Sequence, residues 1–207
     1  SPLDELVTTA GEAEPTPPIE IAPAPTPVSF FETPQQELLL GNSKELLPEL
    51  QTLLSSSPLG FLNVVVKTQL GILSAQEFLE KAKITMPLTL QEMLGENVML
   101  FSYRTDNKKR LGIIFELKDT EGAAEQLQSW ETTLEQDTKP LWEIVGQKGS
   151  AYTPLFRQIA YQGNVVRFQT FSAIDFGIVY TLFGTKFILT TSFESLTRTV
   201  DQIIQSR

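Results

Sequence analysis

Two aspartates are the first residues to consider, because a pair of carboxylates can act as general acid and general base. Asp119 and Asp175 occupy related places in two similar stretches of the chain. Each also has a local explanation. Asp119 has the position of a helix N-cap, where a carboxylate accepts backbone N–H bonds, and Asp175 begins a predicted strand. We therefore expect neither residue to be catalytic.

A stretch of small residues at Gly146, Lys148, Gly149 and Ser150 has the composition of a phosphate-binding loop. Its spacing is not Gly-x4-Gly-Lys-Ser/Thr, and no clear strand passes into a helix there. The glycine pattern of dinucleotide sites, the calcium loop of EF-hands and the Gly-x-Ser-x-Gly elbow are absent from the sequence. We interpret this stretch as a flexible connector and expect no cofactor.

Composition narrows the chemistry further, because the 207 residues include no His and no Cys. Imidazole bases, His- or Cys-ligated zinc, thiolate nucleophiles and disulfides are thereby excluded. A net charge of −9 has the wrong sign for a protein that neutralises many phosphates, so we expect no nucleic-acid partner. No apolar run reaches the roughly 20 residues of a membrane helix.

Two groups of residues are candidates for contact with a partner. The first is a basic cluster with a tyrosine at the tip of a predicted hairpin, which either solvates the tip or contacts an anionic wall polymer or lipid surface. The second is a set of aromatic residues near the loop 146–153, where an exposed apolar patch would mark a partner site. The candidates are Tyr103, Arg104, Lys108, Lys109, Arg110, Tyr152, Phe156 and Tyr161.

The chain divides into a linker and a body. Residues 1–29 hold seven prolines and five acidic residues, with no basic and no aromatic residue, which predicts a disordered acidic Pro-rich linker. Its Pro-x-Pro alternation favours a semi-stiff polyproline II spacer, the alternative being a merely disordered tail. Residues 30–207 are long enough for a single α+β domain.

Periodic segments and capping residues define the elements of the body. Capping boxes are predicted at Asn42/Glu45 and Ser74/Glu77, and helix caps at Asp119 or Thr120 and at Ser192. The predicted strands are 61–69, 98–103, 111–117, 156–161, 165–171, 174–182 and 186–191, with short extended pieces near 28–31 and 37–40.

Two segments, 97–134 and 174–204, follow the same plan of strand, polar turn, strand, capping residue and amphipathic helix. Each alone is a half-covered hairpin with one helix, so we expect the two halves to share a core. The predicted fold is an antiparallel sheet of five to seven strands, with helices packed mainly on one face, built from two ββα-like halves. Chance similarity of two common ββα units is the alternative.

Short runs in these two segments resemble uncharacterised bacterial membrane-anchored envelope proteins. The runs are 111–119 with Ala123-Ala124, then 174–179 and 187–192 with Glu194-Ser195-Leu196. In those proteins the body follows a transmembrane helix and a Pro-rich linker. The resemblance implies an extracytoplasmic location and a membrane anchor upstream of this chain, and it implies no activity or cofactor.

We therefore expect a non-enzymatic interaction or structural module of the bacterial cell envelope, presented on a Pro-rich stalk. Its partner would be a protein or another envelope component, bound through the sheet face or the loop 146–153. The alternatives are an enzyme that uses carboxylates or a metal, and a carrier of an apolar ligand, which would need a large apolar cavity.

Overall fold

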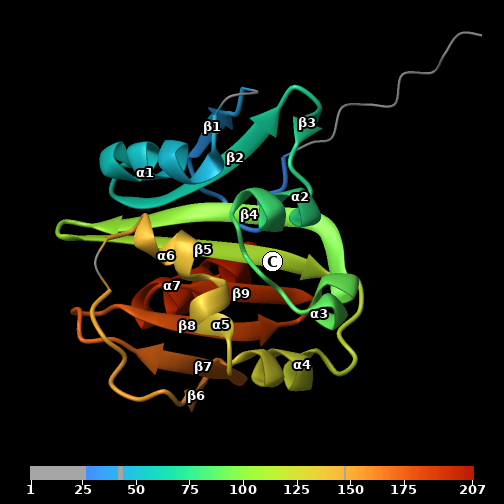
Figure 1. The fold of residues 1–207 in the computed structure, drawn as a ribbon, viewed down its shortest axis with the longest axis vertical. Coiled ribbons are helices and arrows are strands. Elements are labelled where there is room, and N and C mark those ends of the chain that lie inside the picture. Colours follow the sequence, from blue (N-terminus) through green and yellow to red (C-terminus); the bar gives the residue numbers. More distant parts are fainter. Residues whose placement is uncertain (1–26, 42–43, 147) are drawn as a thin grey trace, which may run out of the picture.

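A computed structural model describes residues 27–41, 44–146 and 148–207 (Figure 1). One sheet of nine strands runs through this part of the chain in the order β1-β2-β4-β5-β9-β8-β7-β6, with β3 paired to β2. The strands are β1 (Gln35–Leu39), β2 (Gly60–Thr68), β3 (Gly71–Ile72), β4 (Leu94–Thr105), β5 (Lys108–Leu117), β6 (Arg157–Tyr161), β7 (Asn164–Thr170), β8 (Gly177–Phe183) and β9 (Lys186–Thr190). The helices are α1 (Leu46–Ser56), α2 (Ala75–Lys81), α3 (Leu88–Met93), α4 (Ala123–Trp130), α5 (Leu134–Asp137), α6 (Lys139–Glu143) and α7 (Phe193–Gln205).

The structure confirms a mixed α+β fold with a mostly antiparallel sheet, but the predicted count of five to seven strands is too low. Only the pairing of β1 with β2 is parallel within this sheet. β1 exposes four of its five residues, so it lacks the apolar alternation that marks a strand in a sequence. β3 has two residues, fewer than any periodicity can detect.

Apolar side chains are buried on both faces of the sheet. The larger core lies on the face that α1 to α6 cover, and the smaller core lies on the opposite face, which α7 covers (Figure 1). Successive residues of β5 point to opposite faces of the sheet. Ile113 and Phe115 lie in the larger core, and Ile114 lies in the smaller core. Most helices thus lie on one face, as the sequence predicts.

The two ββα halves share a core as predicted, because both buried clusters hold residues of both hairpins, but their helices do not pack on the same face. The two hairpins do meet, because β5 pairs with β9 at the centre of the sheet. Their helices separate, however, since Leu127 of α4 belongs to the larger core and Leu196 of α7 to the smaller. The face on which a helix packs depends on how the chain leaves the preceding strand, and the local pattern of strands and helix does not encode that direction.

Two of the four predicted helix caps are confirmed. Ser74 and Glu77 form a reciprocal capping box at α2, and the Ser192 hydroxyl accepts a bond from the Ser195 amide at α7. α4 instead begins after Gly122, in the left-handed region at φ 72°, and not at Asp119 or Thr120. Asn42 lies outside the described residues, and Glu45 precedes α1 without a side-chain cap bond.

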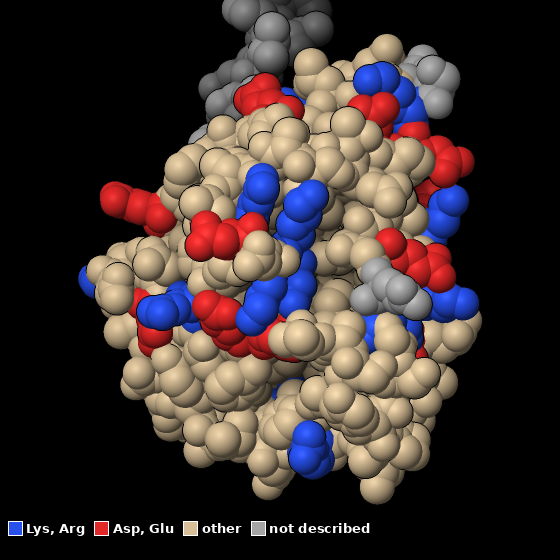
Figure 2. Space-filling view, turned by 90° about the vertical axis from the view of Figure 1, so that its left-hand side faces the viewer, with Lys and Arg blue, Asp and Glu red and all other residues tan. Residues whose placement is uncertain are grey.

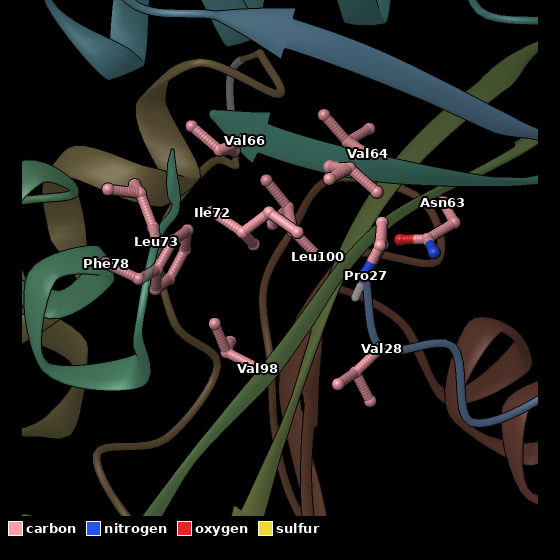
Figure 3. A pocket seen from close by; sticks show the side chains of 11 residues that line it. Pro27, Val28, Asn63, Val64, Val66, Ile72, Leu73, Phe78, Val98 and Leu100 are labelled. Carbon is pink, nitrogen blue, oxygen red and sulfur yellow. The ribbon is translucent and has the colours of Figure 1, made fainter. Parts of the chain in front are cut away.

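The described end of the predicted linker packs against the body. Pro27 and Val28 lie beside the gap between β2 and β4, close to Val98 and Leu100 (Figure 3). Phe31, which follows this segment, is only 3% exposed and belongs to the smaller core. The chain is therefore anchored directly after the predicted linker by an apolar residue of the smaller core; residues 1–26 lie outside the described part.

Replacing Phe31 with alanine is expected to release this anchor. Its ring packs edge-on against Phe61 and Phe101, with centroids 5.1 and 6.0 Å apart. Loss of a buried phenylalanine costs about 3 kcal/mol, and we expect faster protease cleavage before β1 as well as a lower free energy of unfolding. Limited proteolysis and urea unfolding measure the two effects. Tyr152→Ala, which truncates an exposed aromatic residue, is the control, and equal cleavage of both variants would contradict the anchor.

Candidate functional site

The side chains of the basic cluster at the hairpin tip contact two other parts of the protein, the end of α1 and the loop before β8. Arg104 donates to the carbonyl of Ser57, and the Lys109 ammonium donates to the carbonyl of Ser55 at 3.4 Å. Both carbonyls lie at the C-terminal end of α1, whose last turn holds no basic residue of its own. Cations stabilise the negative end of a helix dipole, so these two side chains complete α1.

Arg110 and Lys108 point the other way, toward the loop before β8. The Arg110 guanidinium donates to the carbonyls of Ile174 and Asp175 at 3.0 and 2.9 Å, and Lys108 pairs with the Asp175 carboxylate at 3.2 Å. Arg110 is 7% exposed and lies 5.4 Å from the ring centre of Phe176, and burial lowers its pKa. These contacts hold Asp175 at φ 48°, a left-handed conformation that aspartate tolerates.

Tyr103, the remaining member of the first group, is half-buried and donates to Glu194 of α7 at 3.1 Å. Burial raises the pKa of Tyr103, and the bond to Glu194 adds to the effect. On the side of the molecule shown in Figure 2, Lys and Arg side chains gather near the centre with Asp and Glu side chains directly beside them. The hairpin tip thus forms internal ion pairs and helix-end contacts at a surface of mixed charge.

The structure separates the second group of candidates. Phe156 packs against Tyr180 on the side of the larger core, whereas Tyr161 packs beside the smaller core and donates to Asp201 at 2.8 Å. Tyr152 is exposed, and its amide bonds to the Thr170 carbonyl at 3.0 Å. The described part of the loop 146–153 is therefore fastened along the end of β7.

An apolar groove lies between α7 and β7, on the sheet face of the smaller core. It has a volume of about 260 Å³ and lies at the end of α7 where the helix begins. α7 lies mainly over β5, β8 and β9 and reaches β7 at Val166 and β6 at Tyr161, so only the part of β6 and β7 beside the start of the helix is left open. The groove is lined by Ile159, Phe168, Gln169, Thr170, Asp175, Phe176, Gly177, Val179 and Phe193.

The rim of this groove is fixed by the hairpin tip. Asp175 and Phe176 form one wall, and they are the residues that Lys108 and Arg110 hold. Phe193 also lines the groove and contacts Phe168 edge-on, with centroids 6.4 Å apart. Lys108 and Arg110 of the predicted basic cluster therefore hold the residues that form the rim, and they do not line the groove themselves.

The two aspartates weighed for acid–base chemistry are not neighbours. β5 and β8 both pair antiparallel with β9, so they run in the same direction. Asp119 follows the end of β5, whereas Asp175 precedes the start of β8, which places them at opposite ends of the sheet. Asp119 accepts a bond from the Glu121 amide at 2.9 Å, as an acidic turn residue does.

Two larger hollows, of about 570 and 540 Å³, have more polar linings than the groove and lie beside α3 and beside the loop after α6. The space beneath Pro27 and Val28 has a volume of about 20 Å³, enough for about one water molecule. Within residues 27–41, 44–146 and 148–207, no group of three or more Asp and Glu side chains has the arrangement of a metal site. No helix in the same ranges is long and apolar enough to span a bilayer.

Comparison with protein-family models, curated proteins and solved structures finds no match. The resemblance to envelope proteins thus stays a prediction, and the groove is assigned from its geometry alone. Sequence reasoning missed the groove because Phe168, Phe176 and Val179 sit at strand positions where apolar residues are normally core. A hint was available in Phe193, an aromatic residue directly after the Ser192 cap.

Proposed function

We propose that the chain is a non-enzymatic interaction module of the bacterial cell envelope, presented outside the cytoplasm on its Pro-rich stalk. In this proposal the groove between α7 and β7 binds apolar side chains of a partner protein. The membrane is involved only through an anchor upstream of the chain. The observation that carries the proposal is an apolar groove with a fixed rim on an otherwise covered sheet.

The size and lining of the groove favour side chains over a free small molecule. Its volume of about 260 Å³ lies below the range of roughly 300–1,000 Å³ typical of small-molecule pockets. The carboxylate of Asp175, its one charged lining group, is already paired with Lys108. Ile174, 84% exposed beside the rim, extends the apolar surface outward. One or two apolar side chains on an extended partner surface fit this arrangement.

The anchored linker supports presentation of the groove. Phe31 fixes the point at which the Pro-rich segment leaves the body, so a partner would meet the domain in a restricted range of orientations. Restricted presentation near a surface raises the effective concentration of the groove toward a partner on that surface. This argument supports an interaction role, and the resemblance implies only the location in the envelope.

Filling the groove is the direct test. Thr170 lines the groove and is half-buried, so Thr170→Trp adds a large side chain to the hollow without adding charge. A photo-crosslinking amino acid at Ile174, in the full chain incubated with envelope extract of the source organism, should give a discrete product with one protein. We expect Thr170→Trp to reduce that product about tenfold or more, the effect of losing one buried anchor at an interface.

The matched control is Thr132→Trp, which adds the same side chain at an exposed position away from the groove. The same photo-crosslinker at Leu70, 92% exposed in the β2–β3 turn, reports non-specific capture. A product that persists in Thr170→Trp, or that forms equally from Leu70, would show that the groove does not bind the captured protein.

A further inference from the structure

The two edge strands of the sheet differ in how their unpaired backbone N–H and C=O groups are protected. β1 and β6 are the outer strands of the order β1-β2-β4-β5-β9-β8-β7-β6. An outer strand presents unpaired N–H and C=O groups, which proteins commonly protect with Lys, Pro or a bulge. The five residues of β6, Arg157 to Tyr161, include neither Lys nor Pro, and they pair with β7 without a shift in register.

The turn between β6 and β7 determines which groups of β6 are free. Gln162 and Gly163 both have positive φ, 49° and 75°, the conformation of a two-residue type I′ hairpin turn. Such a turn makes Tyr161 and Asn164 a hydrogen-bonded pair, and the pairs then alternate along the ladder. Gln158 and Ala160 consequently turn their backbone N–H and C=O groups outward.

The neighbouring strand supports this assignment. If Asn164 and Val166 face β6, the backbone carbonyl of Val165 must face β8. That carbonyl accepts a bond from the Thr181 hydroxyl of β8 at 2.8 Å. The outward direction of Gln158 and Ala160 is therefore fixed by two independent features of the hairpin.

We propose that β6 pairs antiparallel with β6 of a second copy of this chain, centred on Ile159, so that the two sheets become continuous. In this register all five residues of each strand are paired. Gln158 faces Ala160 of the second copy, which satisfies the outward groups of both. Ile159 is 49% exposed and faces its own counterpart in a close, non-hydrogen-bonded pair.

Charge complementarity favours this register. Arg157 of one copy lies opposite Tyr161 of the other, on the same face of the joined sheet. The Tyr161 hydroxyl donates to Asp201, so the Arg157 guanidinium of the other copy would lie near both the Tyr161 ring and the Asp201 carboxylate. Both contacts occur twice because the arrangement is two-fold symmetric. No like charges face each other.

The opposite edge of the sheet lacks this complementarity. The centre of β1 is Glu37, and antiparallel self-pairing about that residue would place two carboxylates opposite each other. Glu37 is moreover engaged with Lys67 of β2. Self-association through β6 alone closes into a dimer, whereas pairing through both edges would build an open fibre.

The test uses the full chain in sedimentation velocity experiments from micromolar to millimolar concentration. We expect a monomer–dimer equilibrium. Ala160→Pro removes an outward N–H at a position where an edge strand accepts proline, and should weaken the dimer about tenfold or more. Ile159→Lys, which sets two cations face to face, is the second variant, and Leu70→Lys is its matched control. Far-UV circular dichroism and thermal unfolding verify that each variant is folded.

Single cysteines test the register, because the chain contains no other thiol. Ile159→Cys faces itself across the two-fold axis at a separation that suits a disulfide, so mild oxidation should yield a covalent dimer. Arg157→Cys faces Tyr161 and should yield far less. A chain that stays monomeric at millimolar concentration, or a dimer that survives both Ala160→Pro and Ile159→Lys, would overturn the proposal, as would equal crosslinking of the two cysteine variants.

Ile159 lines the groove and also lies at the centre of the proposed strand pair, so Ala160 and Thr170 are the positions that separate this inference from the partner proposed for the groove. Ala160 does not line the groove, and Thr170 lies beyond the residues of β7 that pair with β6. Thr170→Trp should therefore keep the dimer while losing the crosslinked partner. Ala160→Pro should lose the dimer while the groove remains open.

Discussion

Gly112→Ala is expected to destabilise the protein by about 3 kcal/mol or more, at the upper end of the cost of overpacking a core. Gly112 of β5 lies directly opposite Phe101 of β4. A Cβ at residue 112 would lie 2.0 Å from the Cζ atom of Phe101. The Phe101 ring is fully buried and packs against Phe31 and Phe61, so it has little room to move.

A double-mutant cycle separates this clash from general damage to β5. Phe101→Ala alone should cost about 3–5 kcal/mol, but it also removes the ring that the new methyl group of Gly112→Ala would strike. The double variant should therefore be less destabilised than the sum of the two single variants, as measured by urea unfolding. Gly41→Ala is the matched control, because among the described residues nothing lies within 4 Å of its Cβ position. Additive effects would show that the ring does not occupy the space above Gly112.

Glu131→Ala is expected to cost about 3 kcal/mol, because it leaves two largely buried groups without their partner. Glu131, at the C-terminal end of α4, accepts two bonds from the Arg167 guanidinium of β7 at 2.7 and 2.6 Å. It also accepts a bond from the Tyr180 hydroxyl of β8 at 2.6 Å. Urea unfolding measures the loss. Glu143→Ala, which breaks the exposed Lys139–Glu143 pair, should change stability by less than about 1 kcal/mol.

The same network makes stability depend on alkaline pH. Burial, and then the hydrogen bond to Glu131, raises the pKa of Tyr180 well above its ordinary value of 10.0. The unfolded chain therefore releases this proton at lower pH than the folded chain does. The stabilisation is fully present below the unfolded pKa and is lost as the pH rises toward the folded pKa. Tyr180→Phe should accordingly lose less stability above pH 10.0 than the wild type. Parallel curves for the two proteins would contradict this role of Tyr180.

This network also ties the edge of the sheet to the helical layer. Arg167 donates to the side chain of Gln158 on β6 at 3.1 Å, in addition to its bonds to Glu131. Loss of Glu131 should therefore loosen β6 and β7 before the centre of the sheet. Hydrogen exchange of the Val166 and Phe168 amides in Glu131→Ala would locate the effect.

The local pattern of the sequence determined most of the elements. Alternation and β-branched content placed β4, β5 and β6 to β9, and the spacing of Ser74 with Glu77 fixed the start of α2. These features depend on side chains and backbone groups that are close in the chain, so the sequence alone contains their cause. The Phe31 anchor, the groove and the free edge of β6 depend on segments far apart in sequence.

The run Leu111 to Phe115 shows how far the sequence alone predicts the fold. It is apolar at every position except Gly112, a pattern typical of a strand buried on both faces. The sequence by itself determined that residues 111–117 form a strand, and the tertiary structure placed this strand at the centre of the sheet. Only the tertiary structure decided that α4 covers one face of that sheet and α7 the other, because the burial of each helix depends on the path of the chain between elements. The same paths leave part of β6 and β7 open beside the start of α7 and so create the groove.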